Sequence, residues 1–269
     1  MVSKENSIRA IVKASVQSFA QGFSDRHISE FENPDGTINM KIHNVFIAKL
    51  WPEIQYYTSL VRSLDSSLWN MLESMAINIS ELSYQVEKRV EWPLYPGQTT
   101  FIATLLEKYK RHEMRPPKIS DYQDELRDID GSWITEVKRH ESDYFLTDID
   151  TKERYLIELK IGGDLDNKKA RSEKEALLEQ YAILCNTLDR STKVKIFFGT
   201  AYNRYGEGKA RNQQRVKQFF ADEELLIGRD FWNFICKMQS GYDIVINEYE
   251  KNAHFIIRAL DSIKLTYLW

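Results

Sequence analysis

Three residues near the middle of the chain have the types and spacing that phosphodiester hydrolysis requires: Asp143, Glu158 and Lys160. Carboxylate oxygens bind Mg²⁺, which keeps several waters and binds substrate phosphate oxygens. The metal neutralises charge on the phosphorus oxygens and supplies or positions a hydroxide nucleophile. A lysine beside that water can orient it, favour its deprotonated form or stabilise charge in the transition state. We take these three as candidate catalytic residues, with Asp143 and Glu158 as ligands of a Mg²⁺ cofactor.

Two β-prone runs, 142–150 and 154–161, carry these residues and predict a β-hairpin. Side chains alternate between the faces of a strand, so Glu158 and Lys160 point the same way. A turn centred between residues 151 and 152 would place Asp143 opposite Lys160 and, correspondingly, residue 145 opposite Glu158. Directly opposed residues share a face. The three candidates are therefore expected to cluster on one side of the hairpin.

The neighbours of the three candidates leave alternatives. Leu159 faces the opposite side and is expected to anchor the strand in the core, while its carbonyl is a further candidate metal ligand. Asp148 and Asp150 compete with Asp143 for the aspartate role, but they lie nearer the turn, where Asp is favoured anyway. A glutamate and a lysine on one strand face also commonly form a solvated surface pair worth little. On that alternative the chain is a non-catalytic DNA-binding or interaction domain.

The elements around the hairpin predict an α/β fold. Before it, periodic apolar residues predict helices over 8–23, about 56–90 and 99–110, so the N-terminal half is expected to be helical. After it come a loop at 162–167, a helix whose apolar face includes Leu177 and Leu188, a strand over 193–201, and at least two further helices. We expect a mixed sheet of about five strands with helices on both sides, and we expect the hairpin to put the active site at one edge of the sheet.

Composition adds limits rather than a function. No repeat or flexible linker divides the 269 residues, so we expect a single domain, mainly helical over 1–140 and with the catalytic core and C-terminal helices in 141–269. The net charge of -3 says nothing about where charge gathers. The chain lacks an apolar signal peptide or membrane-length run. Cys185 and Cys236 lie in apolar helical contexts, which favours two buried free thiols and a reducing cytoplasm.

Basic residues predict two DNA-contacting regions. In the segment 204–217, five cationic residues oppose a single glutamate. Arg and Asn or Gln recognise bases through paired hydrogen bonds, while Lys mostly contacts phosphate. The candidates there are Arg204, Lys209, Arg211, Asn212, Gln213, Gln214 and Arg215. A second cluster, Lys168, Lys169, Arg171 and Lys174, follows the hairpin and is placed to clamp the backbone. The alternative for both is a solvated polar surface.

Other motifs point away from rival chemistries. The aromatic residues at 231–234 recur at helical spacing, which favours a core position over base stacking. The five histidines lack metal-ligand spacing. The chain contains no phosphate-binding Walker loop, no glycine-rich dinucleotide motif after a strand and no serine-hydrolase elbow.

Longer segments resemble known families. Residues 141–146 and 155–160 look like the catalytic hairpin of PD-(D/E)xK restriction enzymes, with Ser142 where the Pro of the family name stands. Together with 162–170, 201–208 and 224–235 they are similar to the TdeIII-like type II restriction endonucleases, a group associated with GGNCC-type sites. The resemblance covers residues 141–235, with a fainter match at 63–75.

The resemblance implies a Mg²⁺-dependent homodimer that cuts both strands of double-stranded DNA at a short, nearly palindromic site. A cognate DNA methyltransferase would act on the same site without needing to bind this chain. Many enzymes of this kind add a glutamate from an N-terminal helix; Glu73 is the candidate and Glu81 the reserve, against the alternative of an exposed helix residue. A related repair or junction nuclease that recognises DNA structure is the other reading.

Overall fold

The computed structural model describes residues 3–129, 137–160, 165–210 and 214–268, with the backbone alone at 42, 88–92 and 137–143. The chain forms two compact units: Met1–Ile79 with Asp243–Trp269, and Ser80–Tyr242. Among the described residues, no helix is long and apolar enough to cross a membrane.

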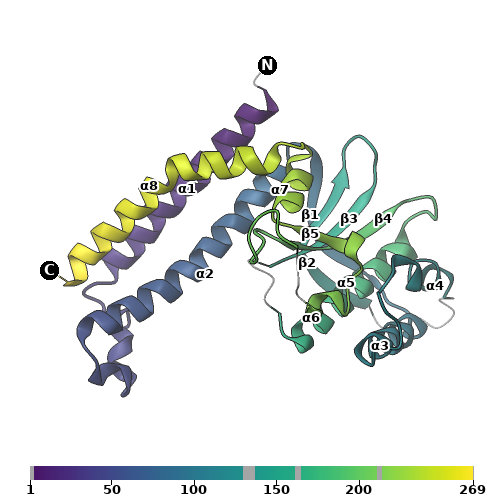
Figure 1. The fold of residues 1–269 in the computed structure, drawn as a ribbon, viewed down its shortest axis with the longest axis horizontal. Coiled ribbons are helices and arrows are strands. Elements are labelled where there is room, and N and C mark those ends of the chain that lie inside the picture. Colours follow the sequence, from purple (N-terminus) through teal and green to yellow (C-terminus); the bar gives the residue numbers. More distant parts are fainter. Residues whose placement is uncertain (1–2, 130–136, 161–164, 211–213, 269) are drawn as a thin grey trace. The chain divides into compact units, whose positions relative to one another are not determined.

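Long helices build the first unit (Figure 1): α1 (Lys4–Ser29), α2 (Pro52–Ser80) and most of α8 (Gly241–Leu268), with the short helices η1 (Asn39–His43) and η2 (Ile47–Lys49) between α1 and α2. α1 and α8 run parallel, because Arg9 pairs with Glu248 near their starts and the Tyr267 hydroxyl donates to the His27 carbonyl near their ends.

The second unit is a mixed sheet with helices on both faces. Within the described residues its strand order is β1 (Tyr84–Pro93), β2 (Val137–Asp148), β3 (Arg154–Lys160), β4 (Val194–Thr200) and β5 (Leu225–Ile227). The pairs β1–β2 and β2–β3 are antiparallel, while β3–β4 and β4–β5 are parallel. The expected mixed sheet of about five strands is confirmed.

The two faces of the sheet carry different cores. One face packs against α3 (Pro96–Lys110) and α5 (Asn167–Thr187), in a cluster that includes Phe145, Leu156 and Leu177. The opposite face carries aromatic rings under α7 (Arg229–Cys236), where Phe234 contacts Tyr155. Four short helices of the described residues complete the unit: η3 (Ile119–Asp121) and α4 (Glu125–Asp128) before the hairpin, and α6 (Gln214–Lys217) and η4 (Asp222–Glu224) between β4 and β5. The expectation that residues 231–234 belong to the core is confirmed for Phe231 and Trp232, which are buried.

The predicted helix over 56–90 is too long. α2 ends at Ser80, and the chain then enters β1, where buried Tyr84 is followed by exposed Gln85. This alternation has the period of a strand, and β1 pairs with β2 along nearly its whole length. Because β1 borders β2 and β4 borders β3, the hairpin lies inside the sheet, and the expectation of an edge position is wrong.

Other expected elements are confirmed. α3 starts three residues before its predicted range and β4 is shorter by one residue at each end, and the helix expected around residues 177–188 is α5. The three-residue β5 was not predicted, because so short a run has no periodicity of its own. Cys185 lies in α5 and Cys236 in α7, and no disulfide joins them.

Candidate active site

The C-terminal end of β3 brings Glu158 and Lys160 together, as strand alternation predicts. The Lys160 Nζ atom lies 2.5 Å from Glu158 Oε1. Glu158 is 9% exposed, on the same face as buried Leu156. A buried carboxylate costs free energy unless it is paired. This pair is therefore half-buried and held, unlike the solvated surface pair that we considered as the alternative.

A second carboxylate reaches Lys160 from α5. Glu173 Oε1 lies 3.2 Å from Lys160 Nζ, so the ammonium is held between two carboxylates from different elements. Glu173 was not among the residues predicted from the sequence. A signal was present: Ala170 and Leu177 stand three residues before and four after it, and both are fully buried, so Glu173 occupies the inward stripe of the helix.

The register of the hairpin differs from the predicted one by two residues. Tyr144 pairs with Ile157, and Phe145 pairs with Leu156 rather than with Glu158. The reason is the turn, which begins earlier than the sequence indicated. Asp148 Oδ1 accepts hydrogen bonds from the backbone N–H groups of residues 150 and 151 and so closes the loop at this position. A shift by two residues leaves the paired residues 144–147 on their predicted faces.

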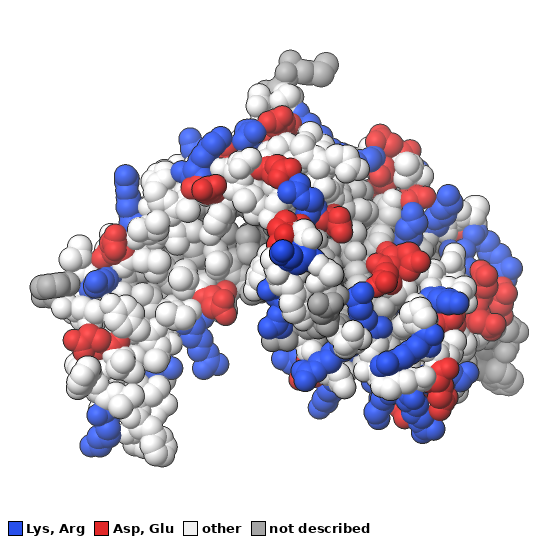
Figure 2. Space-filling view, in the orientation of Figure 1, with Lys and Arg blue, Asp and Glu red and all other residues white. Residues whose placement is uncertain are grey.

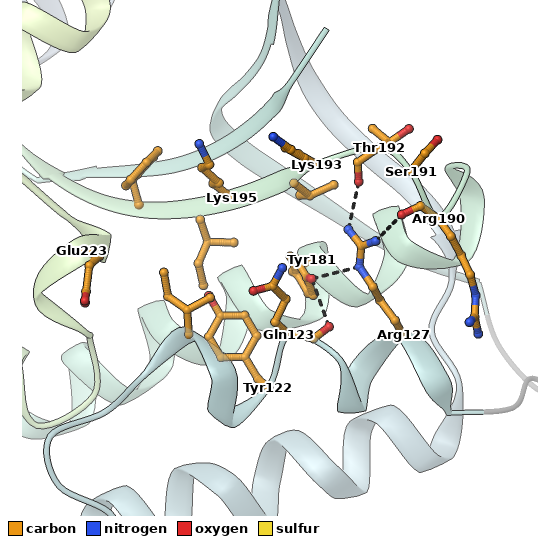
Figure 3. A pocket seen from close by; sticks show the side chains of 14 residues that line it. Tyr122, Gln123, Arg127, Tyr181, Arg190, Ser191, Thr192, Lys193, Lys195 and Glu223 are labelled. Carbon is orange, nitrogen blue, oxygen red and sulfur yellow. Dashed lines mark hydrogen bonds between the residues drawn. The ribbon is translucent and has the colours of Figure 1, made fainter. Parts of the chain in front are cut away.

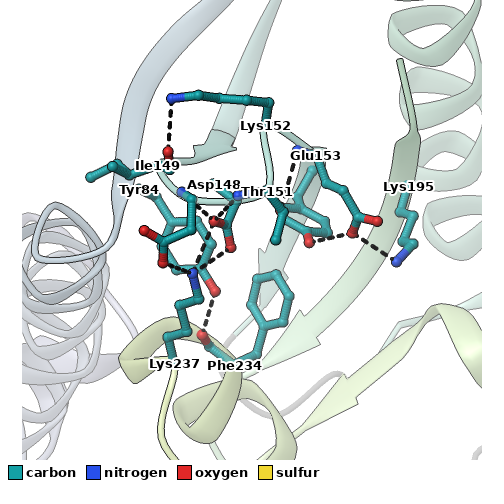
Figure 4. A network of polar contacts seen from close by, with 11 residues as sticks. Tyr84, Asp148, Ile149, Thr151, Lys152, Glu153, Lys195, Phe234 and Lys237 are labelled. Carbon is teal, nitrogen blue, oxygen red and sulfur yellow. Dashed lines mark hydrogen bonds and ion pairs between the residues drawn. The ribbon is translucent and has the colours of Figure 1, made fainter. Parts of the chain in front are cut away.

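The competing aspartates belong to the turn (Figure 4). Lys237 Nζ lies 2.9 Å from Asp148 Oδ2 and 2.7 Å from Asp150 Oδ2. Burial alone would raise the pKa of Asp148, but the N–H of residue 151 and the Lys237 ammonium hold it below its usual value overall. Thr147, next to Asp148, pairs with Arg154, four residues before Glu158. That is about 13 Å along the strand, so these aspartates lie far from the lysine site.

Asp143 lies in β2, one residue before Tyr144, and its side chain is outside the described part of the chain. Leu159 is buried as predicted. The N–H of Arg154 and the carbonyl of Lys160 bond to the β4 side of the sheet. Backbone groups alternate direction along a strand, so the Leu159 carbonyl points toward β2.

The donor set around Glu158 suits Mg²⁺ in kind, because a carboxylate and a backbone carbonyl offer the hard oxygen ligands that this ion prefers. Among the residues whose side chains are described, no group of three His, Cys, Asp or Glu is close enough to bind a metal. Asp143 is the expected additional carboxylate, and it falls outside that search.

Three connections leave the sheet at the end where Lys160 lies. Lys160 pairs with Thr200, and Thr200 pairs with Ile227, so the C-terminal ends of β3, β4 and β5 meet there. The segment leading to α5, the loop at 201–210 and the start of α7 all emerge from this end. Ligands of open α/β sheets bind at the carboxyl ends of parallel strands.

The loop at 201–210 presents predicted DNA-contacting residues to solvent. Arg204 and Lys209 are exposed. Asn203 closes the loop, since its side chain donates to the Lys209 carbonyl and accepts from the Tyr205 N–H. Gln214 and Arg215 are exposed in α6, which follows. Three more candidates lie outside the described residues: Arg211, Asn212 and Gln213.

The cluster at the start of α5 is only partly available to DNA. Lys168 and Lys169 are exposed in the first turn, which Asp166 caps. Arg171 is half-buried, 3.8 Å from a carboxylate of α3. Lys174 does not belong to this surface, and its predicted role is wrong. Figure 2 shows Lys and Arg gathered over the part of the second unit where Figure 1 draws α3 and α6.

Lys174 is instead buried in an ion pair. Its Nζ atom lies 2.5 Å from Glu224 Oε1, and both side chains are 1% exposed. The Tyr122 hydroxyl donates to the same carboxylate at 2.6 Å. Burial lowers the pKa of Lys174, and Glu224 opposes that effect. Because Lys174 follows Glu173 in sequence, this pair fixes the rotation of α5 that aims Glu173 at Lys160.

The candidate N-terminal glutamates do not belong to the hairpin. Glu73 lies in α2 of the first unit, while the hairpin belongs to the second. Its role beside the hairpin stays a prediction. The reserve candidate, Glu81, is exposed in the turn after α2.

A cavity of about 540 Å³ lies at the other end of β4 (Figure 3), lined by residues 193–197 of that strand region. Arg127 reaches into its wall, where its guanidinium donates to Tyr181 and to the carbonyls of Arg190 and Thr192. These bonds tie the α5–β4 connection together. The cavity is therefore remote from Lys160, at the opposite end of the parallel strands.

Comparison with known proteins gives one match. The family model described as "Type II restriction endonuclease, HinfI" matches residues 4–253. No curated protein matches the chain. No solved structure matches it either.

Proposed function

Because the chain belongs to the HinfI family of type II restriction endonucleases, which are site-specific deoxyribonucleases, we propose that it cuts DNA at a Mg²⁺-dependent site of the PD-(D/E)xK type formed by Asp143, Glu158 and Lys160. The observation that carries this proposal is the Lys160 ammonium, held between Glu158 and Glu173 at the C-terminal end of a central strand. The family match independently supports type II restriction cleavage.

The observed register supports a place for Asp143. The β2–β3 pairing ends at Tyr144 and Ile157, next to a register shift in β2 between Glu141 and Phe145. The same register continued by one residue would set Asp143 across from Glu158. The Asp148 N–H bonds to the residue 153 carbonyl, which makes every second pair from there a hydrogen-bonded one. Asp143 and Glu158 would then form a non-hydrogen-bonded pair, in which the Cα atoms lie only about 4.5 Å apart. Two carboxylates at that separation, with the Leu159 carbonyl beside them, provide oxygen ligands for one ion.

Each group then has a defined task. Mg²⁺, when bound, neutralises charge on the phosphate and lowers the pKa of a water. Asp143 and Glu158 hold the ion and fix the reacting phosphate on the exposed end of the strand. Lys160 orients the attacking water and stabilises charge in the transition state. The water oxygen forms the new bond to phosphorus, the opposite P–O ester bond breaks, and a proton passes to the departing oxygen.

The surface around Lys160 supports DNA binding. Arg204 and Lys209 are exposed in a loop that leaves the sheet at the same end, and Lys168 and Lys169 are exposed at the start of α5. Lys contacts position the phosphate backbone, while Arg can form bidentate bonds to guanine. We propose that the loop contacts bases and that the α5 residues grip the backbone near the cut.

The target is a short, nearly palindromic sequence, cut on both strands by a homodimer. The TdeIII-like grouping, and the GGNCC-type site that came with it, remain predictions, since the matching family model is that of HinfI. A methyltransferase that protects the same sequence completes the proposed restriction-modification pair without binding this chain.

Plasmid digestion tests the proposal. Purified protein with Mg²⁺ should give sharp fragments, EDTA should abolish them, and mapped fragment ends give the recognition sequence. Lys160→Ala should remove cleavage. Lys193→Ala is the matched control, because Lys193 is exposed at the far end of the sheet. This variant should cut plasmid as the wild type does.

Two results would contradict the proposal. Intact plasmid across salt and pH would leave a DNA-binding module, in which Glu158→Ala changes local stability alone. A Mg²⁺-dependent smear, or cleavage confined to branched DNA, would indicate a nuclease without sequence specificity.

A further inference from the structure

The segment between α1 and α2, with the start of α2, exposes an unusual set of large apolar side chains. We call this set the apolar tip: Met40, Val45, Phe46, Leu50, Trp51, Ile54, Tyr57 and Val61. Phe46 is 83% exposed and Trp51 77%. Figure 2 shows this part of the first unit as a largely white projection at the lower left. Single exposed apolar residues are ordinary, whereas a contiguous group of this size marks a binding surface.

In helix α2, the exposed apolar residues of the apolar tip are separate from the residues that form the core. Its inward side buries Tyr56 and Leu60 against Phe23 of α1. Ile54, Tyr57 and Val61 are exposed at positions i, i+3 and i+7, which form a second apolar stripe on one helix face. A surface helix with a single packing partner has one apolar stripe and a polar opposite face. The second stripe therefore indicates a second partner.

The size of the apolar tip fits a protein partner. With whole side-chain areas of roughly 150–250 Å², the exposed fractions leave about 900 Å² of surface. A stable interface buries about 800 Å² on each side. Exposed Lys49 and Glu53 flank Trp51 and supply a polar rim. An aromatic and aliphatic centre with a charged rim is the composition of protein interfaces, whereas DNA-binding surfaces are strongly basic.

We propose that the apolar tip is the surface through which two copies of this chain form a twofold dimer. This inference rests on the proposed function, since a type II enzyme that cuts both strands needs two catalytic hairpins, and the described residues provide one per chain. A twofold axis joins the same patch on both copies, so Phe46 and Trp51 of one copy meet their counterparts. The apolar tip of each copy is then buried against the apolar tip of the other, and no different protein is needed to cover it.

Sedimentation velocity of the full chain, combined with plasmid cleavage, tests the proposal. The mass derived for the wild type should be twice the 31.7 kDa of one chain. Phe46→Glu with Trp51→Glu places like charges at the axis and should raise the dimer dissociation constant at least 100-fold. The separated chains should nick plasmid into open circles instead of linearising it. The control is Ile257→Glu on α8, equally apolar and 58% exposed but outside the apolar tip, and it should stay dimeric.

The outcomes separate this inference from the proposed function. A double variant that stays dimeric, an Ile257→Glu variant that dissociates as readily, or a monomeric wild type that linearises plasmid would overturn the dimer surface. In the last case the nuclease proposal stands. A wild type that is dimeric through the apolar tip yet cuts no DNA would overturn the nuclease proposal alone.

The circular dichroism spectrum of each variant should match that of the wild type, since all the changed side chains are exposed. A variant that fails this check is replaced by Val45→Glu, also within the apolar tip.

Discussion

The Lys160 ammonium and the Glu173 carboxylate come from different elements, β3 and α5, yet their Nζ and Oε1 atoms lie 3.2 Å apart. Glu158 holds the other side of the same ammonium. The position of Lys160 along the strand is thus fixed by β3, and the direction of its side chain by α5. A helix is therefore expected to set the accuracy of a site whose three central candidates, Asp143, Glu158 and Lys160, come from the hairpin.

Removing Glu173 should lower the rate of cleavage and leave the affinity for DNA nearly unchanged. With Glu173→Ala, Lys160 loses one carboxylate partner, and a displacement of about 1 Å can cost on the order of 100-fold in rate. We expect kcat to fall about 10- to 100-fold with little change in KM, and Glu173→Gln to recover part of the loss. Glu175→Gln, on the same helix, is the control. Unchanged single-turnover rates for Glu173→Ala would refute a positioning role.

Asp143 and Asp148 should respond differently to the same change. Asp143→Asn should abolish cleavage with little effect on folding, because it removes a proposed metal ligand. Asp148→Asn should leave kcat nearly unchanged but lower the free energy of unfolding by about 1–3 kcal/mol, since a buried charged group loses partners. Urea denaturation and plasmid cleavage of both variants distinguish the roles. If Asp148→Asn abolished cleavage and Asp143→Asn did not, the metal ligand would be the aspartate in the turn.

The contribution of Asp148 to stability should depend on acidity. The folded-state pKa of Asp148 is lowered, so its contribution is fully present above the unfolded value of about 3.9. It is lost as pH falls through the lower folded value, because the protonated side chain no longer pairs with Lys237. The difference in unfolding free energy between wild type and Asp148→Asn should therefore be constant above about pH 5 and shrink below pH 4. A difference that does not change with pH would exclude this ionisation.

The buried pair of Lys174 and Glu224 should be far more sensitive to one change than to two. Among the described residues, Lys174→Met leaves the buried Glu224 with the Tyr122 hydroxyl and a backbone N–H as donors, which should cost about 3–5 kcal/mol. Replacing Glu224 by Leu as well should recover most of that loss, because the unpaired charge is gone. Chemical denaturation of the single and double variants measures this. A double variant less stable than Lys174→Met would contradict this expectation and show that Glu224 stabilises the fold even without Lys174, through its bonds to Tyr122 and the Ala221 N–H.

Salt dependence tests the basic loop. If Arg204 and Lys209 contact phosphates, each change to Ala should weaken DNA binding across all sequences and reduce the slope of log K against log salt by about 1. If Arg204 contacts a base, its change should instead cost about 1–3 kcal/mol on the cognate site alone. Binding titrations on cognate and random duplexes at several salt concentrations separate these cases. If both variants bind DNA with the same affinity and salt dependence as the wild type, the loop is not part of the DNA interface.

Local patterns were sufficient for the hairpin and for several helices. Alternation placed Glu158 and Lys160 on one face, and an error of two residues in register did no harm, because the period of a strand is two. The turn itself could not be located from composition. Asp148 closes it with its own side chain while Lys237, 89 residues further along the chain, holds that carboxylate in place.

Contacts between distant segments account for most of what the sequence analysis missed. Residues 84–93 continue an apolar pattern from α2, and pairing with β2 makes them a strand. Lys174 resembles its basic neighbours in every local respect, yet Glu224 lies 50 residues away and draws it into the core. Glu173 was detectable as an acid in the inward stripe of a helix, but its partner was visible only in three dimensions.

The strand that carries Glu158 and Lys160 is hydrogen-bonded on both sides, by β2 and by β4, whereas Arg204 and Lys209 stand on a solvent-exposed loop. Loops accept substitutions and insertions that a central strand does not. Over evolutionary time, such a scaffold can exchange the side chains that choose a DNA sequence while the hydrolytic centre stays constant. Relatives of this chain would then be expected to diverge in their targets sooner than in their chemistry.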